Sequence, residues 1–115
     1  MWDFNAINLE KGLERVMGRK ELYIQLLDKF FCDETVAGLK TAAESLNADE
    51  LKTELHKLKG TAANLSVDLI AKRAAEIYEE LKNNAAIDKI ADNCIELAAE
   101  FDKTSNMYFV HKSTI

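Results

Sequence analysis

Apolar residues recur at intervals of three and four along most of the chain, which is the spacing of one face of an α-helix. Five segments show this pattern, each bounded by residues that typically begin or end helices. The pattern predicts helices over about residues 9–17, 19–46, 48–65, 67–81 and 87–101, and it leaves open an extension of the last helix to residue 108. The second helix is long, and we expect it to bend near residues 32–35.

Polar residues and glycines near the predicted boundaries suggest how the helices are capped. Asn8 can cap the first helix, and either Asn47 or Asp49 can cap the central one. We expect Ser66 to cap the helix that follows the central one. Gly12 lies inside the first helix, where a glycine costs about 1 kcal/mol. Close packing and simple tolerance explain that glycine equally well.

The helix pattern defines the expected fold class. Four substantial amphipathic helices with short connections predict an all-α, antiparallel up-and-down four-helix bundle, and the short additional N-terminal helix would act as a lid on one end. A length of 115 residues fits a single domain over residues 1–115, with its core at about 7–101 and a tail at 105–115. No helix carries a second continuous apolar stripe, which favours a monomer.

Composition and charge narrow the possible functions. The chain is 48% hydrophobic and 30% charged and has no proline, as expected of a soluble helical protein. Its formal net charge of -5 argues against general binding of nucleic acid or anionic membranes. Neither a membrane-spanning apolar run nor a secretory signal is visible, which predicts a cytoplasmic protein. Cys32 and Cys94 are expected to be buried free thiols.

The central helix places a histidine opposite its apolar side. At about 100° per residue, the apolar residues of this helix fall within roughly 40° of one direction. These residues are Leu51, Leu55, Leu58, Ala62 and Leu65. His56 lies about 140° from the centre of that stripe, on the side expected to face solvent. The same sector holds Lys52, Lys59, Gly60 and Ala63.

The neighbours of His56 suggest a site rather than an ordinary surface. Lys59 lies three residues further on and could stabilise charge on a transferring phosphoryl group, although it could also be only a solvated lysine. Gly60 lies one turn after His56, where the absence of a side chain would let another protein approach the imidazole. Ala63 leaves the next turn open as well.

Other chemistries fit the sequence less well. A di-metal bundle needs Glu-x-x-His pairs, whereas Glu54 is only two residues before His56. A zinc site would need further histidines or cysteines at helical spacing, and His111 lies in the predicted tail. Nucleophilic hydrolysis would need a serine or cysteine beside a base and an orienting acid. We therefore expect neither a metal site nor a self-contained active site.

Residues 56–65 resemble the signature of the histidine-containing phosphotransfer (HPt) domain family, which is roughly H-x-L-K-G-[small]-[small]-x-x-L-G. They read HKLKGTAANL. The similarity covers about residues 7–101, and its upstream part rests on Ile7, Gly12, Leu13, Arg15, Gly18, Leu22, Tyr23, Leu26, Leu27 and Phe30. Two residues depart from the pattern: Ser66 stands where a glycine is usual, and Arg19 where a glycine or acidic residue is common.

The resemblance implies a division of roles on the central helix. His56 would be the phosphorylated residue, Lys59 would support the phosphoryl group, and Gly60 would keep the docking surface clear. The docking face would also include Lys52, Lys57 and Ala63. The implied partners are response-regulator receiver domains and a hybrid or sensor histidine kinase. Mg²⁺ is expected on the receiver, and no cofactor on this chain.

The leading hypothesis is a phosphorelay intermediate that carries a phosphoryl group on His56 between receiver aspartates. It would be a phosphocarrier without its own ATP site, since no ATP-binding pattern occurs. A non-phosphorylated helical adaptor is the first alternative. The second is a domain excised from a hybrid sensor kinase, or the dimerising phosphotransfer part of a kinase. Met1 directly before the family-like region favours a stand-alone chain.

Overall fold

The computed structural model describes residues 3–115, and all the regular secondary structure in that range is helical. The all-α prediction is therefore confirmed for the described residues. Along the chain, the helices are α1 (Leu9–Arg15), α2 (Lys20–Phe30), α3 (Glu34–Glu44), α4 (Ala48–Asn64), α5 (Asp68–Lys82), α6 (Ile87–His111) and a 3-10 turn (Lys112–Thr114).

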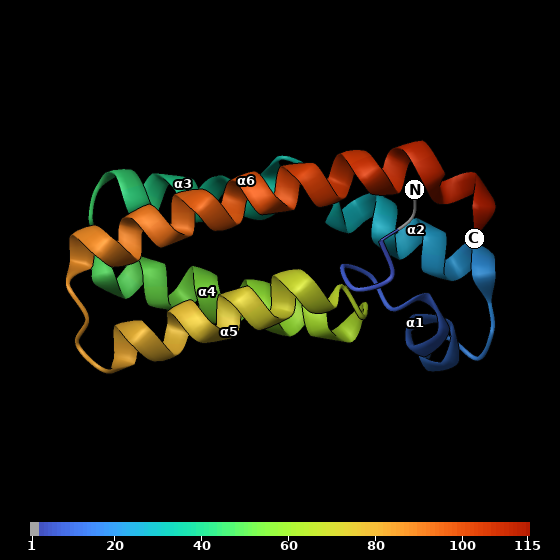
Figure 1. The fold of residues 1–115 in the computed structure, drawn as a ribbon, viewed down its shortest axis with the longest axis horizontal. Coiled ribbons are helices and arrows are strands. Elements are labelled where there is room, and N and C mark those ends of the chain that lie inside the picture. The colour runs from blue at the N-terminus through green and yellow to red at the C-terminus, as the bar shows by residue number, and fades with distance from the viewer. Residues whose placement is uncertain (1–2) are drawn as a thin grey trace.

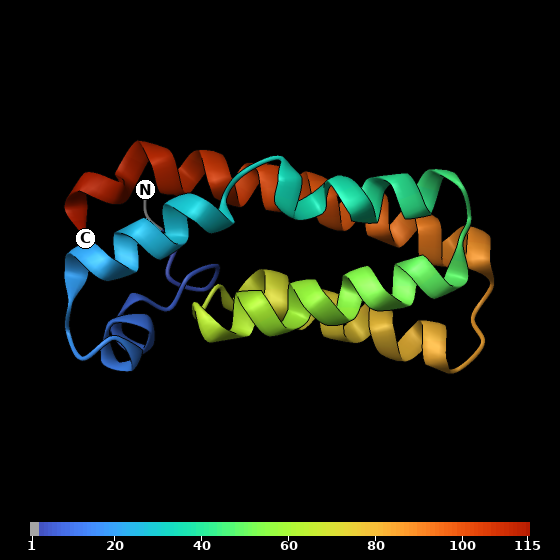
Figure 2. The same cartoon turned by 180° about the vertical axis from the view of Figure 1, so that it is seen from behind.

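Helices α3, α4, α5 and α6 lie side by side along the long axis of the molecule (Figures 1 and 2). Helix α3 packs against α4 and α6, and α5 packs against the same two helices, so the four surround one apolar core. Helix α2 extends the line of α3 along the second half of α6. Helix α1 lies beyond the end where α4 gives way to α5.

The first helix begins as the sequence predicts. The Asn8 side chain accepts a hydrogen bond from the Lys11 N–H at 3.1 Å, which caps α1. Gly12 is buried, and a Cβ atom at this position would overlap the Tyr23 ring. Close packing against α2, rather than tolerance, therefore accounts for the glycine.

The predicted long helix is broken rather than bent. Helix α2 ends at Phe30 and α3 begins at Glu34. The Thr35 hydroxyl donates to the Phe30 carbonyl at 2.6 Å, which satisfies an oxygen at the end of α2. Phe30 and Phe31 are both buried, and each ring contacts the Phe101 ring of α6, with centroids 5.4 and 5.6 Å apart.

The break also corrects the expectation for one of the cysteines. Cys32 lies between α2 and α3, outside the helical stripes, and is exposed rather than buried. Cys94 is buried on α6 as predicted, and both thiols are free. Burial, with a smaller contribution from the Glu80 carboxylate, raises the pKa of the Cys94 thiol to about 12.

The corner between α4 and α5 differs from the sequence prediction. Ser66 does not cap α5, because it adopts a φ of 58° and Val67 precedes the first residue of α5. Its side-chain oxygen is buried and has no hydrogen-bond partner within residues 3–115. A left-handed conformation favours glycine, which is the residue that the resembled signature has at this position.

Hydrogen bonds from the N-terminal helices hold this corner. The Asn8 N–H donates to the Ser66 carbonyl at 2.8 Å. The Tyr23 hydroxyl donates to the Leu65 carbonyl at 2.6 Å. Burial, with a smaller contribution from the Asp68 carboxylate, raises the pKa of Tyr23 to about 12. Helices α1 and α2 thus fix the position of the α4–α5 corner.

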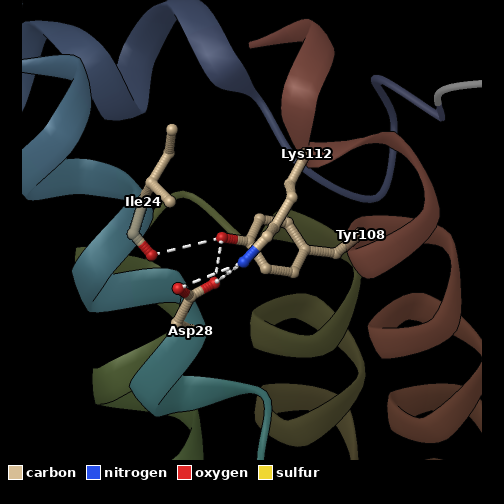
Figure 3. Close-up of polar contacts among 4 residues, drawn as sticks. All are labelled: Ile24, Asp28, Tyr108 and Lys112. Atoms are coloured by element: carbon tan, nitrogen blue, oxygen red, sulfur yellow. Dashed lines mark hydrogen bonds and ion pairs between the residues drawn. The ribbon is translucent and has the colours of Figure 1, made fainter.

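The predicted tail at 105–115 is also wrong, because α6 continues to His111. Tyr108 is fully buried, and its ring lies 5.0 Å from that of Phe31. Its hydroxyl lies 2.7 Å from Asp28 Oδ1 and 3.2 Å from the Ile24 carbonyl oxygen, while Lys112 Nζ lies 3.2 Å from the same carboxylate (Figure 3). These contacts dock the end of α6 on α2.

Replacing the buried tyrosine tests whether the end of α6 belongs to the core. We expect Tyr108→Ala to lower the free energy of unfolding by about 3 kcal/mol, because it removes a large buried ring. Val110→Ala, at a position that is 72% exposed, should change it by less than about 0.5 kcal/mol. Chemical denaturation measures both, and equal effects would contradict the docked helix.

The strained serine gives a second stability prediction. Ser66→Gly should raise the free energy of unfolding by about 1 kcal/mol, because it relieves the positive φ and removes a buried hydroxyl without a partner. Ser45 has a φ of -90°, so Ser45→Gly should give no gain. Urea denaturation of the two variants compares them directly, and a destabilising Ser66→Gly would refute this explanation.

Candidate functional site

Four buried side chains determine which side of α4 faces solvent. Leu51, Leu55, Leu58 and Ala62 are each at most 4% exposed. His56 is exposed on the opposite side, as the helical spacing predicts. The Asn47 side chain accepts from the Glu50 N–H at 3.1 Å, so Asn47 rather than Asp49 caps the helix.

An aromatic ring of α5 lies against the exposed histidine. The rings of His56 and Tyr78 have centroids 5.7 Å apart and are tilted by 44°. Lys59 Nζ lies 5.0 Å from the centroid of the Tyr78 ring, and Lys82 Nζ lies 5.6 Å from it. The structure therefore gathers an imidazole, a phenol ring and two ammonium groups, from two helices, in one place.

Sequence reasoning identified His56 and Lys59 but missed Tyr78 and Lys82. The available signal was their i, i+4 spacing, which places both on one side of α5 next to the buried Ile77. That spacing does not reveal that they face α4, because the pairing of the two helices depends on the geometry of the corner between them.

The turn after His56 is open. A Cβ atom built on Gly60 would meet no described atom within 4 Å, so packing inside the chain does not require a glycine there. Gly60 is exposed and Ala63 is half-buried. The Thr61 hydroxyl donates to the Lys57 carbonyl at 3.0 Å within the helix, which makes it a helix-bonding residue.

The other flank of α4 borders a groove against α2 and α3. Apolar side chains from both sides line it, namely Leu26, Phe30, Leu58 and Leu65. Lys57 also lines this groove, and its ammonium lies 3.8 Å from the Glu54 carboxylate. His56 and Gly60 thus form a ridge between this groove and Tyr78, since their positions on the helix lie between the two flanks.

Two further residues lie apart from this cluster: the predicted docking residue Lys52, and His111, to which the sequence assigned no role. Lys52 is exposed one turn before His56. His111 is at the far end of α6, away from α4. Within residues 3–115, no group of three or more His, Cys, Asp or Glu residues is arranged to hold a metal ion. Nor does any helix in this range have the length and apolarity to cross a membrane.

Comparison with known families assigns the chain to a family. The family model of the Hpt domain matches residues 25–106. The chain belongs to the Hpt domain family. Comparisons with curated proteins and with solved structures gave no match. The predicted resemblance is thereby confirmed, although α1 and the first turn of α2 precede the matched region of this Hpt domain.

Membership sets the broad class of function. Hpt domains are phosphocarrier modules of two-component signalling that interact with kinases and receivers, and they are not catalytic enzymes. The matched region of this Hpt domain contains His56, Lys59, Gly60 and Tyr78.

The two departures from the family pattern leave the turns of this Hpt domain intact. Ser66 keeps the left-handed conformation that a glycine would adopt, with a φ of 58°. Arg19 precedes α2 with an ordinary φ of -77° and makes no capping bond through its side chain. Both residues lie outside the cluster around His56, so neither changes its chemistry.

Proposed function

We propose that this Hpt domain is a phosphorelay intermediate that accepts a phosphoryl group from a receiver aspartate onto His56 and passes it to another receiver. The observation that carries the proposal is the exposed imidazole of His56 on a ridge of α4, with the Lys59 ammonium on one flank and the open Gly60 on the next turn. The ridge lies inside the region that the Hpt family model matches.

The transfer needs little from this chain. A neutral imidazole nitrogen attacks phosphorus in the acyl phosphate, the phosphorus–oxygen bond to aspartate breaks as a phosphorus–nitrogen bond forms, and the carboxylate leaves. Lys59 would stabilise the negative charge of the transferring group. The receiver would supply its acidic residues and Mg²⁺. The Hpt domain itself would bind no cofactor.

The helical scaffold supports this role because the buried apolar side of α4 fixes the orientation of the helix. We infer that α3 to α6 form the antiparallel up-and-down four-helix bundle of a monomeric, cytoplasmic phosphocarrier, with α1 as its lid. In such a scaffold the buried stripe of α4 holds His56 outward, and no closure of the chain over the histidine is needed before a partner binds.

A receiver would dock on the ridge and the groove beside it. Gly60 and Ala63 would let the partner approach the imidazole, while Leu26 of α2 would offer apolar contact along the groove. Lys52 and Lys57 would face the acidic surface of the receiver. The charge of Lys57 is partly offset by the Glu54 carboxylate 3.8 Å away, whereas Lys52 would add positive charge on this face of a chain with a net charge of -5 and would favour an acidic partner.

Transfer of labelled phosphoryl groups from receivers tests the assignment. Incubation with phosphorylated receivers should give the Hpt domain an acid-labile, base-stable label. We expect this label to be absent from His56→Gln and retained in His111→Gln, which removes the other histidine. Label retained in His56→Gln would contradict the site. Failure of every receiver to label the wild-type chain would instead favour a non-phosphorylated adaptor.

The role of Lys59 gives a separate kinetic prediction. Lys59→Ala should slow transfer to His56 by about tenfold, which corresponds to losing one charge-assisted contact of about 1.4 kcal/mol. Lys52→Ala, on the same side but one turn before His56, should slow it less than threefold. Rapid-quench measurement with one receiver compares the rates, and equal melting temperatures of the variants and the wild type show that the fold is intact. Equal rates for Lys59→Ala and the wild type would rule the role out.

A further inference from the structure

Tyr78 is the shared neighbour of three groups in the site. Its ring contacts the imidazole of His56 and lies within 6 Å of the Lys59 and Lys82 ammonium nitrogens. Lys59 comes from the same helix as His56, whereas Lys82 lies one turn after Tyr78 on α5. The ring therefore joins the two helices at the point where the proposed chemistry occurs.

An aromatic ring can hold cations where they would otherwise disperse. Two ammonium groups repel each other and, on long flexible side chains, prefer separate positions in water. The negative face of a phenol ring attracts ammonium groups within about 6 Å. Lys82 is also 3.8 Å from the Glu79 carboxylate, on its own helix. That ion pair restricts the Lys82 side chain, whose ammonium nitrogen still lies 5.6 Å from the centroid of the Tyr78 ring.

We propose that Tyr78 is a positioning residue that holds the ammonium groups of Lys59 and Lys82 beside His56, so that both can neutralise an incoming phosphoryl group. The inference rests on the proposed phosphorylation of His56. It adds Lys82 as a second cation and assigns Tyr78 a role through its ring. A phosphoryl group offers anionic oxygens, which attract ammonium groups more strongly than a ring does, so both lysines can leave the ring for the phosphoryl group.

The ring, rather than the hydroxyl, carries this role. Among residues 3–115, the Tyr78 ring contacts the imidazole and the two ammonium groups, and the side chain also packs against the apolar core. Phenylalanine keeps the same ring face, whereas leucine fills similar space without one. Tyr78→Phe and Tyr78→Leu therefore form a matched pair of variants.

The placement of the lysines can be tested without phosphorylation. In the 115-residue chain, the side-chain methylene protons nearest the ammonium groups of Lys59 and Lys82 should show ring-current shifts in the NMR spectrum. These shifts should persist in Tyr78→Phe and disappear in Tyr78→Leu. Random-coil shifts for both lysines in the wild-type protein would overturn the proposal.

Phosphorylation by phosphoramidate, a small donor that needs no receiver, tests the functional step. The rate constant for labelling His56 should fall about fivefold in Tyr78→Leu, as expected for the loss of two weak cation–π contacts, and stay within twofold of wild type in Tyr78→Phe. In a Lys59→Ala, Lys82→Ala background, Tyr78→Leu should have no further effect, because the groups that it positions are gone.

Three results with the Tyr78 variants would overturn the proposal. They are a wild-type rate in Tyr78→Leu, a fivefold loss that persists in the background without the lysines, and a rate in Tyr78→Phe as low as in Tyr78→Leu. Failure of phosphoramidate to label wild-type His56 would overturn it as well. If phosphoramidate labels His56 but no receiver does, the relay role fails while the role of Tyr78 is still decided by the variants.

Discussion

Burial of the α4 stripe is the constraint on which the site depends. Leu51, Leu55, Leu58 and Ala62 face the core, and each buried leucine contributes about 1.5–3 kcal/mol relative to exposure. Rotating α4 by one residue, about 100°, would expose part of this stripe and carry His56 toward the edge of the core. Burial of these apolar side chains fixes the rotation of α4 about its axis. The residues that make His56 face solvent therefore take no part in its chemistry.

The α4–α5 corner sets how α5 packs against α4, so that the site contains residues of both helices. Tyr23 and Asn8 hold the carbonyls of Leu65 and Ser66, and this fixes where α5 begins. From there, the buried side of α5 places Tyr78 against His56. The strained residue Ser66 therefore lies in the turn that sets how α4 and α5 pair. The hydrogen bonds from Asn8 and Tyr23 hold that turn in place.

Much of this arrangement could be predicted from the sequence, because it depends on local periodicity. Spacing alone placed His56 opposite the stripe, and Asn8 was correctly identified as a cap. Tyr78 could not be placed, because its contact with His56 requires the pairing of two helices. Cys32 was misjudged because the apolar pattern does not show that the chain leaves the helix for three residues.

The end of α6 was mistaken for a tail because charged and polar residues precede Tyr108 in the sequence. The structure shows that the residues between Phe101 and Tyr108 expose polar side chains on one face while the helix remains docked on the other. Tyr108 was the residue in the sequence that could have indicated a docked helix end. Its contact with Asp28 can be predicted only when α2 is known to lie alongside α6.

The most direct test of the central claim is NMR of the protein labelled with ¹⁵N at its histidines, after phosphorylation by a receiver. We predict phosphorus coupling on one imidazole nitrogen of His56, with the His111 ring unchanged and the same signal in His111→Gln. Coupling on His111, or receiver-dependent label without phosphorus coupling on either histidine, would contradict the account.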